Sequence, residues 1–318
     1  MRSRPLLALA LVGALATGCS EEAAPEIVRP PEVVRPAPVY DPDLEPAAAV
    51  MAVVPAEATV LEVTDFDQVR LSLGFGELTS ASDKGVRARF WRRADQRSPL
   101  LSRGMLRDQG YQQRFGFTQD DVSWEAHFTG PAIEGYVVKF RDDLDMSGVA
   151  RAAQAADGPL AGATVVAAAH VAAVGATREP TESWAAEPEL VDLVGQTSLS
   201  TYVARDCLRV EEAFGRDVTG ELAPSPAADL AGLDALGAFS VGFGGTVVSV
   251  RLGPARDDVF DRARLAERLP ATDPDFGTGF TDPVADPVGG RIGFQLGDGP
   301  VAAALAHERQ LPFAVCGG

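Results

Sequence analysis

The chain has 318 residues, and its 45 acidic against 28 basic residues give a formal net charge of −17 at pH 7. Such a charge argues against nucleic acid or anionic lipid as a partner of the folded part, because polyanions repel an acidic surface. Nearly all basic residues are Arg and Ala is abundant, which is typical of a GC-rich genome.

The N-terminus has the layout of a secretory signal peptide, residues 1–18. Arg2 and Arg4 precede an apolar run from Leu6 to Ala16, and small residues follow. This run is shorter than the roughly 20 residues that a membrane-spanning helix needs. It ends in Leu15-Ala16-Thr17-Gly18-Cys19, a bacterial lipobox in which Ala16 stands where Leu is preferred. We therefore expect an exported lipoprotein, anchored to the outer face of the cell membrane by a lipid on Cys19; simple secretion is the alternative.

Residues 19–47 are rich in Pro, Glu and Ala, with prolines too closely spaced for a helix or a sheet. This composition predicts a semi-extended tether. Loss of Arg2 and Arg4 with the signal peptide takes the net charge to −19.

Residues 48–197 are expected to form a first α+β unit. Residues 58–63 predict a strand, and Asp65 then caps a helix that ends at Gly74. Apolar residues at helical spacing predict two more helices, at 86–94 and 105–111, with their aromatic side chains in the core.

A hairpin is the clearest pattern in this unit. Residues 122–129 alternate with period two, and a second alternating run follows at 136–141. The alternation places Glu125 and His127 on the solvent face. Asp145 and Ser147 then offer N-cap oxygens to a helix that extends to about residue 156.

Residues 198–318 repeat this order as a second unit. A strand at 201–204 and a helix at 208–214 precede a hairpin whose turn is assigned to Gly244-Gly245, with Phe243 facing Thr246. A helix at 257–269 is expected to bury Phe260, and a strand at 291–296, a helix at 301–309 and a closing strand at 311–315 follow.

The repeated order of strand, helix, hairpin, helix and strand predicts an α+β fold made of two similar ferredoxin-like (split β-α-β) units, each an antiparallel sheet with helices on one face. One continuous mixed sheet flanked by helices is the alternative.

Two cysteines remain once Cys19 carries a lipid. In an oxidising compartment Cys207 and Cys316 are expected to form a disulfide. Closing a loop of this length is worth about 4 to 5 kcal/mol in the chain-entropy model. Two separate buried thiols are the alternative.

No catalytic constellation is present, so no catalytic residue and no cofactor are predicted. The chain lacks the G-x-S-x-G motif of many hydrolases, and His127, His170 and His307 have no motif partner. A surface hydrolase with paired carboxylates, acting on glycan or peptide, remains the alternative, although no pair stands out.

No metal site is predicted either. Asp143 to Gly148 resembles the first half of a calcium loop, but Gln154 occupies the position of the bidentate carboxylate. N-capping of the following helix is a simpler explanation of these residues. Asp273, Asp275, Asp282 and Asp286 could gather a cation, although a solvated loop is the simpler reading.

Residues 58–74 and Gly116 to Glu125, together with the lipobox, resemble uncharacterised cell-surface lipoproteins of GC-rich Gram-positive, actinobacterial-type bacteria. The resemblance implies a location and no activity. In a Gram-negative host, Ser20 after the lipidated Cys19 would indicate the outer membrane. We expect a non-enzymatic envelope protein that binds an unidentified protein or small molecule, through a sheet face or a groove between its halves, and that does not bind nucleic acid.

Overall fold

The computed structural model describes residues 39–107, 110–215, 230–267 and 274–317. The predicted signal peptide, Cys19 and the predicted tether up to residue 38 lie outside this description. One compact unit extends from Ala37 to the C-terminus, and its first helix begins at Pro46.

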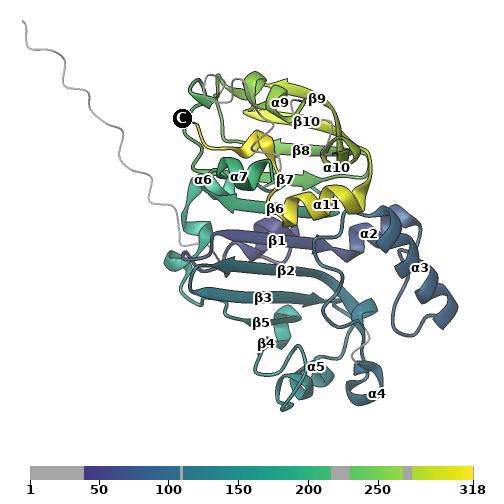
Figure 1. Cartoon of the computed structure of the whole chain (residues 1–318). Coiled ribbons are helices and arrows are strands. Elements are labelled where there is room, and N and C mark those ends of the chain that lie inside the picture. The colour runs from purple at the N-terminus through teal and green to yellow at the C-terminus, as the bar shows by residue number, and fades with distance from the viewer. Residues whose placement is uncertain (1–38, 108–109, 216–229, 268–273, 318) are drawn as a thin grey trace, which may run out of the picture. The chain divides into compact units, whose positions relative to one another are not determined.

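Ten strands form a single sheet in which every neighbouring pair is antiparallel (Figure 1). The strands are β1 (Val60–Asp65), β2 (Val122–Gly130), β3 (Ile133–Phe140), β4 (Thr164–Val166), β5 (Val171–Val174), β6 (Ser200–Arg205), β7 (Ala238–Phe243), β8 (Val247–Arg251), β9 (Phe280–Asp286) and β10 (Arg291–Leu296). The α-helices are α1 (Pro46–Val50), α2 (Phe66–Leu73), α3 (Lys84–Arg97), α4 (Tyr111–Phe115), α5 (Met146–Ala153), α6 (Pro188–Val191), α7 (Val210–Ala213), α9 (Val259–Glu267), α10 (Pro274–Gly279) and α11 (Gly299–His307).

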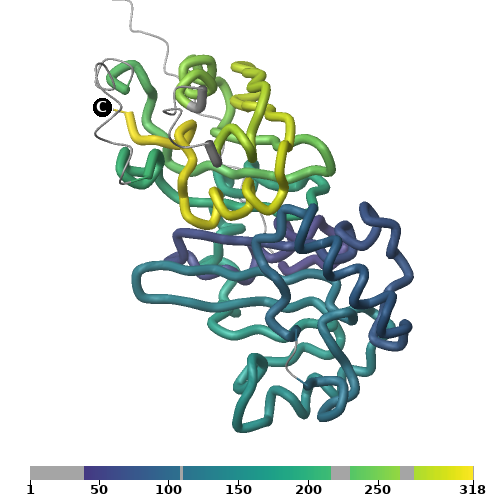
Figure 2. Tube along the Cα trace, turned by 45° about the vertical axis from the view of Figure 1, so that its right-hand side comes forward, coloured from purple at the N-terminus to yellow at the C-terminus, as the bar shows by residue number. Residues whose placement is uncertain are grey.

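The two halves of the chain have the same strand order, outward from the centre of the sheet. The first half runs β1-β2-β3-β5-β4 and the second runs β6-β7-β8-β10-β9, and the antiparallel pair β1·β6 joins them. Figure 2 shows the purple segment that contains β1 between the rest of the first half and the green and yellow second half. The α+β class is therefore confirmed, within one continuous sheet.

The ferredoxin-like arrangement of each unit is not confirmed. A split β-α-β unit joins parallel strands by a helical crossover. Here the chain leaves β1, passes through α2, α3 and α4, and returns as β2 directly beside it in the antiparallel sense. Each half is thus a three-stranded meander followed by a hairpin, β5-β4 or β10-β9.

The sheet is buried on both faces in the first half. Leu61, Val63 and Phe128 pack on one face against α1 and Trp184, whereas Val138 and other residues pack on the opposite face against α5. In the second half, a core of Phe, Val and Leu side chains joins one face of the sheet to α9 and α11. Burial on both faces explains why several strands read as continuous apolar runs.

Several local predictions are confirmed. Asp65 accepts a hydrogen bond from the Gln68 amide at the start of α2, and Gly74 ends this helix with a φ of 77°. Asp145 caps α5 through the Ser147 amide, and β2 and β3 form the expected hairpin. The predicted helix at 105–111 is instead a turn followed by α4.

The β7–β8 hairpin forms in a different register from the predicted one. Phe243 pairs with Val248, and the Gly244 amide donates to the Val247 carbonyl, so Gly245 and Thr246 form the turn. The partner of Phe243 is therefore two residues further along than expected. Because side chains alternate with period two, a shift of two residues keeps the same face buried.

Four further expectations were wrong. Phe260 is 54% exposed, because α9 turns Val259, Arg262 and Ala263 toward the core instead. Residues 312–314 form a 3₁₀ helix that Pro312 starts, rather than a strand. The Asp282 and Asp286 segment is β9, an edge strand that tolerates its proline at position 283. Glu125 is fully buried.

The disulfide between Cys207 and Cys316 is confirmed, with a Cα–Cα distance of 4.8 Å and a sequence separation of 109. It ties the C-terminal segment to the loop after β6. The Cys316 amide also donates to the Leu208 carbonyl, at 2.8 Å.

Candidate functional site

The first candidate site is an apolar pocket of about 420 Å³ at the outer edge of the first half. It lies where β3, β5 and β4 end the sheet and where the chain from the tether enters the fold. Its lining is mostly Val and Ala: Val39, Tyr40, Ala52, Val53, Val137, Gly162, Thr164, Val166, Ala169, Val171, Ala173, Val174, Gly175, Ala176, Thr177, Arg178 and Pro180. Its volume falls within the range of about 300 to 1,000 Å³ that is usual for small-molecule sites.

The sequence places these side chains here by the alternation of β5. Val171 and Ala173 face the pocket, whereas Ala172 between them packs into the core on the other face. Val166 on the edge strand β4 stays 49% exposed at the pocket. The sequence of this Ala/Val run does not predict its structure, because short apolar residues favour neither strand nor helix clearly.

Tyr40 gives the pocket a polar group. Its hydroxyl is buried and has no hydrogen-bond partner among the described residues. Burial raises the pKa of this hydroxyl, and the negative charge of Asp142 adds to the effect, so Tyr40 stays a neutral donor. Nδ1 of His170, next to the lining residues Ala169 and Val171, is likewise buried without a partner in the described structure. Buried polar groups normally have partners, and of these two residues Tyr40 is the one that lines the pocket.

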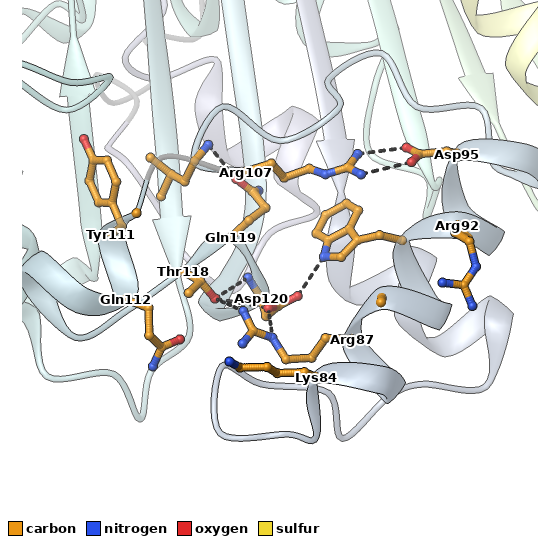
Figure 3. A pocket seen from close by; sticks show the side chains of 14 residues that line it. Lys84, Arg87, Arg92, Asp95, Arg107, Tyr111, Gln112, Thr118, Gln119 and Asp120 are labelled. Carbon is orange, nitrogen blue, oxygen red and sulfur yellow. Dashed lines mark hydrogen bonds and ion pairs between the residues drawn. The ribbon is translucent and has the colours of Figure 1, made fainter.

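A second cavity, of about 490 Å³, lies beside α3 and is lined by charged residues (Figure 3). Asp120 is at its centre: its carboxylate pairs with Arg87 and accepts from the Trp91 indole at 2.8 Å. Asp120 is almost fully buried, and Arg87 also donates to the Thr118 hydroxyl. These contacts hold α3 against the short helix before β2.

Arg107 closes one side of this cavity. Its guanidinium makes two hydrogen bonds to the Asp95 carboxylate, at 2.8 and 3.0 Å, and stacks 4.3 Å from the Trp91 ring centroid. In Figure 3, Arg92 points away from the groups that the dashed lines connect. The cavity is therefore lined by structural ion pairs, with Lys84 and Arg92 as cations that have no ion pair to a described residue.

The centre of the sheet carries a row of polar side chains where the helices of the two halves meet. Glu62 pairs with His127 on β2 and with Tyr202 on β6 in the strand register, and its carboxylate lies 2.8 Å from Nδ1 of His307 on α11. His127 and His307 thus both lie next to Glu62. The sequence could not indicate this, because His307 is 245 positions from Glu62.

Glu125 is a diagonal neighbour of Glu62, since Glu125 pairs with Thr64. Its carboxylate is fully buried and accepts from the Ser102 hydroxyl, the Met105 amide and the Gln119 amide group. These donors occupy the oxygens that would otherwise act on a substrate. The two carboxylates are thus close in the sheet, but Glu125 is closed to solvent.

The acidic residues that had been weighed as metal ligands take other places. Asp145 caps α5, and Asp143 pairs with Arg141 at 3.2 Å. Asp282 and Asp286 lie on β9, whereas residue 273 lies outside the described residues. Across the described ranges, no group of three or more His, Cys, Asp or Glu residues is placed to bind one metal ion.

Within the same ranges, no helix has the length and hydropathy needed to cross a membrane.

The fold and the first pocket define an α+β protein with an apolar cavity at the edge of its sheet. No family model and no curated protein matches the chain. Among solved structures, crystal form I of TP0453 is similar to it with 10% sequence identity and a TM-score of 0.36, over 84% of this chain and 98% of that one. Crystal form III of TP0453 gives 9% identity and a TM-score of 0.33, over 81% and 97%. Likeness at this level carries no argument about function.

Proposed function

We propose that the chain is an exported, non-enzymatic lipoprotein that holds an amphiphilic small molecule, with an apolar body and a hydrogen-bonding head, in the apolar pocket. The observation that carries the proposal is the pocket itself, whose lining includes Tyr40, with a buried hydroxyl that has no hydrogen-bond partner among the described residues. Val and Ala side chains offer no chemistry for catalysis, but they fit an alkyl chain. A head group that accepts a hydrogen bond would satisfy Tyr40.

The lipobox supports an anchor through Cys19. Val39, which lines the pocket, is 20 positions after Cys19. Even fully extended, this stretch spans at most about 70 Å, so the pocket would stay within reach of the membrane that supplies such ligands. Incorporation of labelled palmitate into the wild-type chain, and not into Cys19→Ser, tests the anchor separately from the pocket.

The pocket is tested with a dansyl-labelled undecanoic acid as the probe. Ala173→Phe fills the cavity and should weaken binding at least about tenfold, and Tyr40→Phe should weaken it about threefold to tenfold, the usual range for one hydrogen bond. Val284→Phe also introduces a phenylalanine, on the exposed edge strand β9 remote from the pocket, and should bind like the wild type. Equal binding by Ala173→Phe and the wild type would contradict the proposal.

The alternative, a surface hydrolase with paired carboxylates, has less support. Glu62 and Glu125 occupy diagonal positions on one face of the sheet, which typically lie about 7 to 8 Å apart. However, the hydrogen bonds that surround Glu125 leave only Glu62 facing solvent, and Glu62 itself pairs with His307.

We also infer that the two halves derive from the duplication of one unit. The identical strand order outward from β1·β6 supports this. A relative that contains one half alone, and that dimerises through the strand equivalent to β1, would be the expected single-unit form.

A further inference from the structure

The positive charge of this acidic chain is concentrated in one segment. Residues 84–107, which include α3, contain eight basic residues and only one acidic residue, Asp95. The basic residues are Lys84, Arg87, Arg89, Arg92, Arg93, Arg97, Arg103 and Arg107. The rest of the chain is correspondingly more negative than the overall charge of −17. Asp83, directly before the segment, is engaged as the N-cap of α3.

Most of these cations are open to solvent. Arg87 and Arg107 pair with Asp120 and Asp95, but the other six make no ion pair with any described residue. Five of the six are exposed: Lys84, Arg89, Arg92, Arg97 and Arg103. Although the chain has 45 acidic residues, these six cations have no ion-pair partner among the described residues. Such a surface attracts an anionic partner at a range set by the Debye length.

The helix presents these cations on a rigid support. Phe90 and Ala94 are fully buried and fix one side of α3 against α2. The opposite side carries Arg89 and Arg92, which are three positions apart and so lie on one face. A helix of 14 residues is about 21 Å long, which is enough to contact several headgroups at once.

We propose that the exposed face of α3, with Arg103 beyond it, docks on the anionic phosphate headgroups of a lipid bilayer. The choice of a bilayer rests on the proposed function, in which a lipid on Cys19 already holds the chain at a membrane. A tether alone leaves the orientation of the domain free. The cationic face would turn toward the anionic surface, while the acidic remainder would be repelled from it.

The test uses the mature chain, residues 19–318, with Cys19→Ser, so that no lipid contributes to binding. The compact unit begins at Ala37 and is untouched by this change. Co-sedimentation is measured with vesicles of equal parts phosphatidylglycerol and phosphatidylcholine, and with phosphatidylcholine alone. Binding to the anionic vesicles only, despite the negative net charge, is the expected result.

The triple variant Arg89→Glu/Arg92→Glu/Arg93→Glu should lower the partition coefficient by about 100-fold or more, because each cation near the surface strengthens binding about fivefold. The control, Arg209→Glu/Arg264→Glu/Arg291→Glu, makes the same change in charge at exposed positions elsewhere and should bind like the parent chain. Should the α3 variant fail to fold, as judged by circular dichroism, salt titration of the parent chain decides: 0.5 M salt should abolish binding.

Three results would overturn the proposal. They are equal binding to both kinds of vesicle, equal losses in the two triple variants, and tighter binding to soluble polyphosphate than to the anionic vesicles. None of them depends on the palmitate or the pocket measurements, so the proposed function and this inference can fail separately.

Discussion

Asp65 shows how burial can set the pH dependence of stability. It is 7% exposed, and burial raises its pKa to about 7 although the amide of Gln68 donates to it. Because the folded state then holds this proton more tightly than the unfolded state, the free energy of unfolding falls as pH rises from about 4 to about 7. Each unit of pH in this window costs up to about 1.4 kcal/mol.

We expect Asp65→Asn to remove this dependence, because Asn caps the helix without titrating. The stability advantage of the variant over the wild type should be small at pH 4 and should grow until about pH 8. Urea unfolding of both proteins across this range measures it. Parallel pH curves would show that Asp65 ionises freely in the folded chain.

Arg262 is a buried cation that ties the C-terminal segment to α9. It pairs with Asp258 at 2.7 Å and donates to the carbonyls of Phe313, Val315 and Asp234. Burial would raise the pKa of Asp258, but hydrogen bonds from Arg256 and Arg262 outweigh it and lower that pKa. The carboxylate therefore stays charged and depends on its partners.

Arg262→Met should cost more than about 2 kcal/mol, since it leaves the buried carbonyls of Phe313 and Val315 without this donor, although Arg256 still pairs with Asp258. Arg264→Met, on the same helix, removes only an exposed pair with Asp261 and should cost less than about 0.5 kcal/mol. Chemical denaturation of the two variants compares them. Similar losses would mean that the buried network contributes no more than a surface pair.

Sequence patterns predicted helix caps more reliably than they predicted which residues are buried. The N-cap at Asp65 depends on its own next three residues, so the sequence was sufficient. The burial of Glu125 depends on Ser102 and Gln119, which belong to a segment that folds over the strand. Alternation along one strand cannot reveal what covers its outer face. The pocket at Tyr40 was missed for the same reason, since its walls come from distant stretches.

Among the elements, hairpins with strong alternation were predicted, and edge strands were not. β2–β3 was found from period two alone, whereas β9 contains a proline and many aspartates and so looks like a loop. Backbone hydrogen bonds to β10 hold β9 in the sheet, although its sequence does not have the pattern of a strand. The pairing of β1 with β6 could not be predicted from the sequence either, because the residues around β1 do not specify which distant strand lies beside it.

The turn between β9 and β10 should be the least tolerant hairpin turn to substitution. Gly290 has a φ of 58°, and a Cβ there would lie 1.6 Å from the Gly253 carbonyl oxygen. Gly290→Ala must therefore move one of two backbones and should cost more than about 1 kcal/mol. Gly245→Ala in the β7–β8 turn meets no atom within 4 Å and is the matched control. Equal melting temperatures of the two variants would refute this reading.

For the whole molecule, the net charge gives the average over the surface and not the local charge of one segment. A value of −17 argued against any anionic surface, yet the sequence holds eight cations within residues 84–107. An average over the chain hides this segregation, and the fold decides which of those cations reach solvent. Only the structure shows that most of them are exposed and make no ion pair with a described residue.

The continuous sheet makes a prediction about cooperativity. All three tryptophans, Trp91, Trp124 and Trp184, belong to the first half, whereas the disulfide of Cys207 and Cys316 belongs to the second. If β1·β6 couples the halves into one cooperative unit, the loss of the disulfide must destabilise both together. Replacing both cysteines by Ser should remove about 4 to 5 kcal/mol in the chain-entropy model.

The measurement is thermal unfolding followed by tryptophan fluorescence, which reports on the first half alone. In a single cooperative unit, the fluorescence midpoint of Cys207→Ser/Cys316→Ser falls as far as the midpoint seen by far-ultraviolet circular dichroism, which reports on both halves. In two independent units, the fluorescence midpoint stays at its wild-type value while the circular dichroism curve splits in two. The second outcome would mean that the backbone pairing of β1 with β6 joins two domains that fold separately.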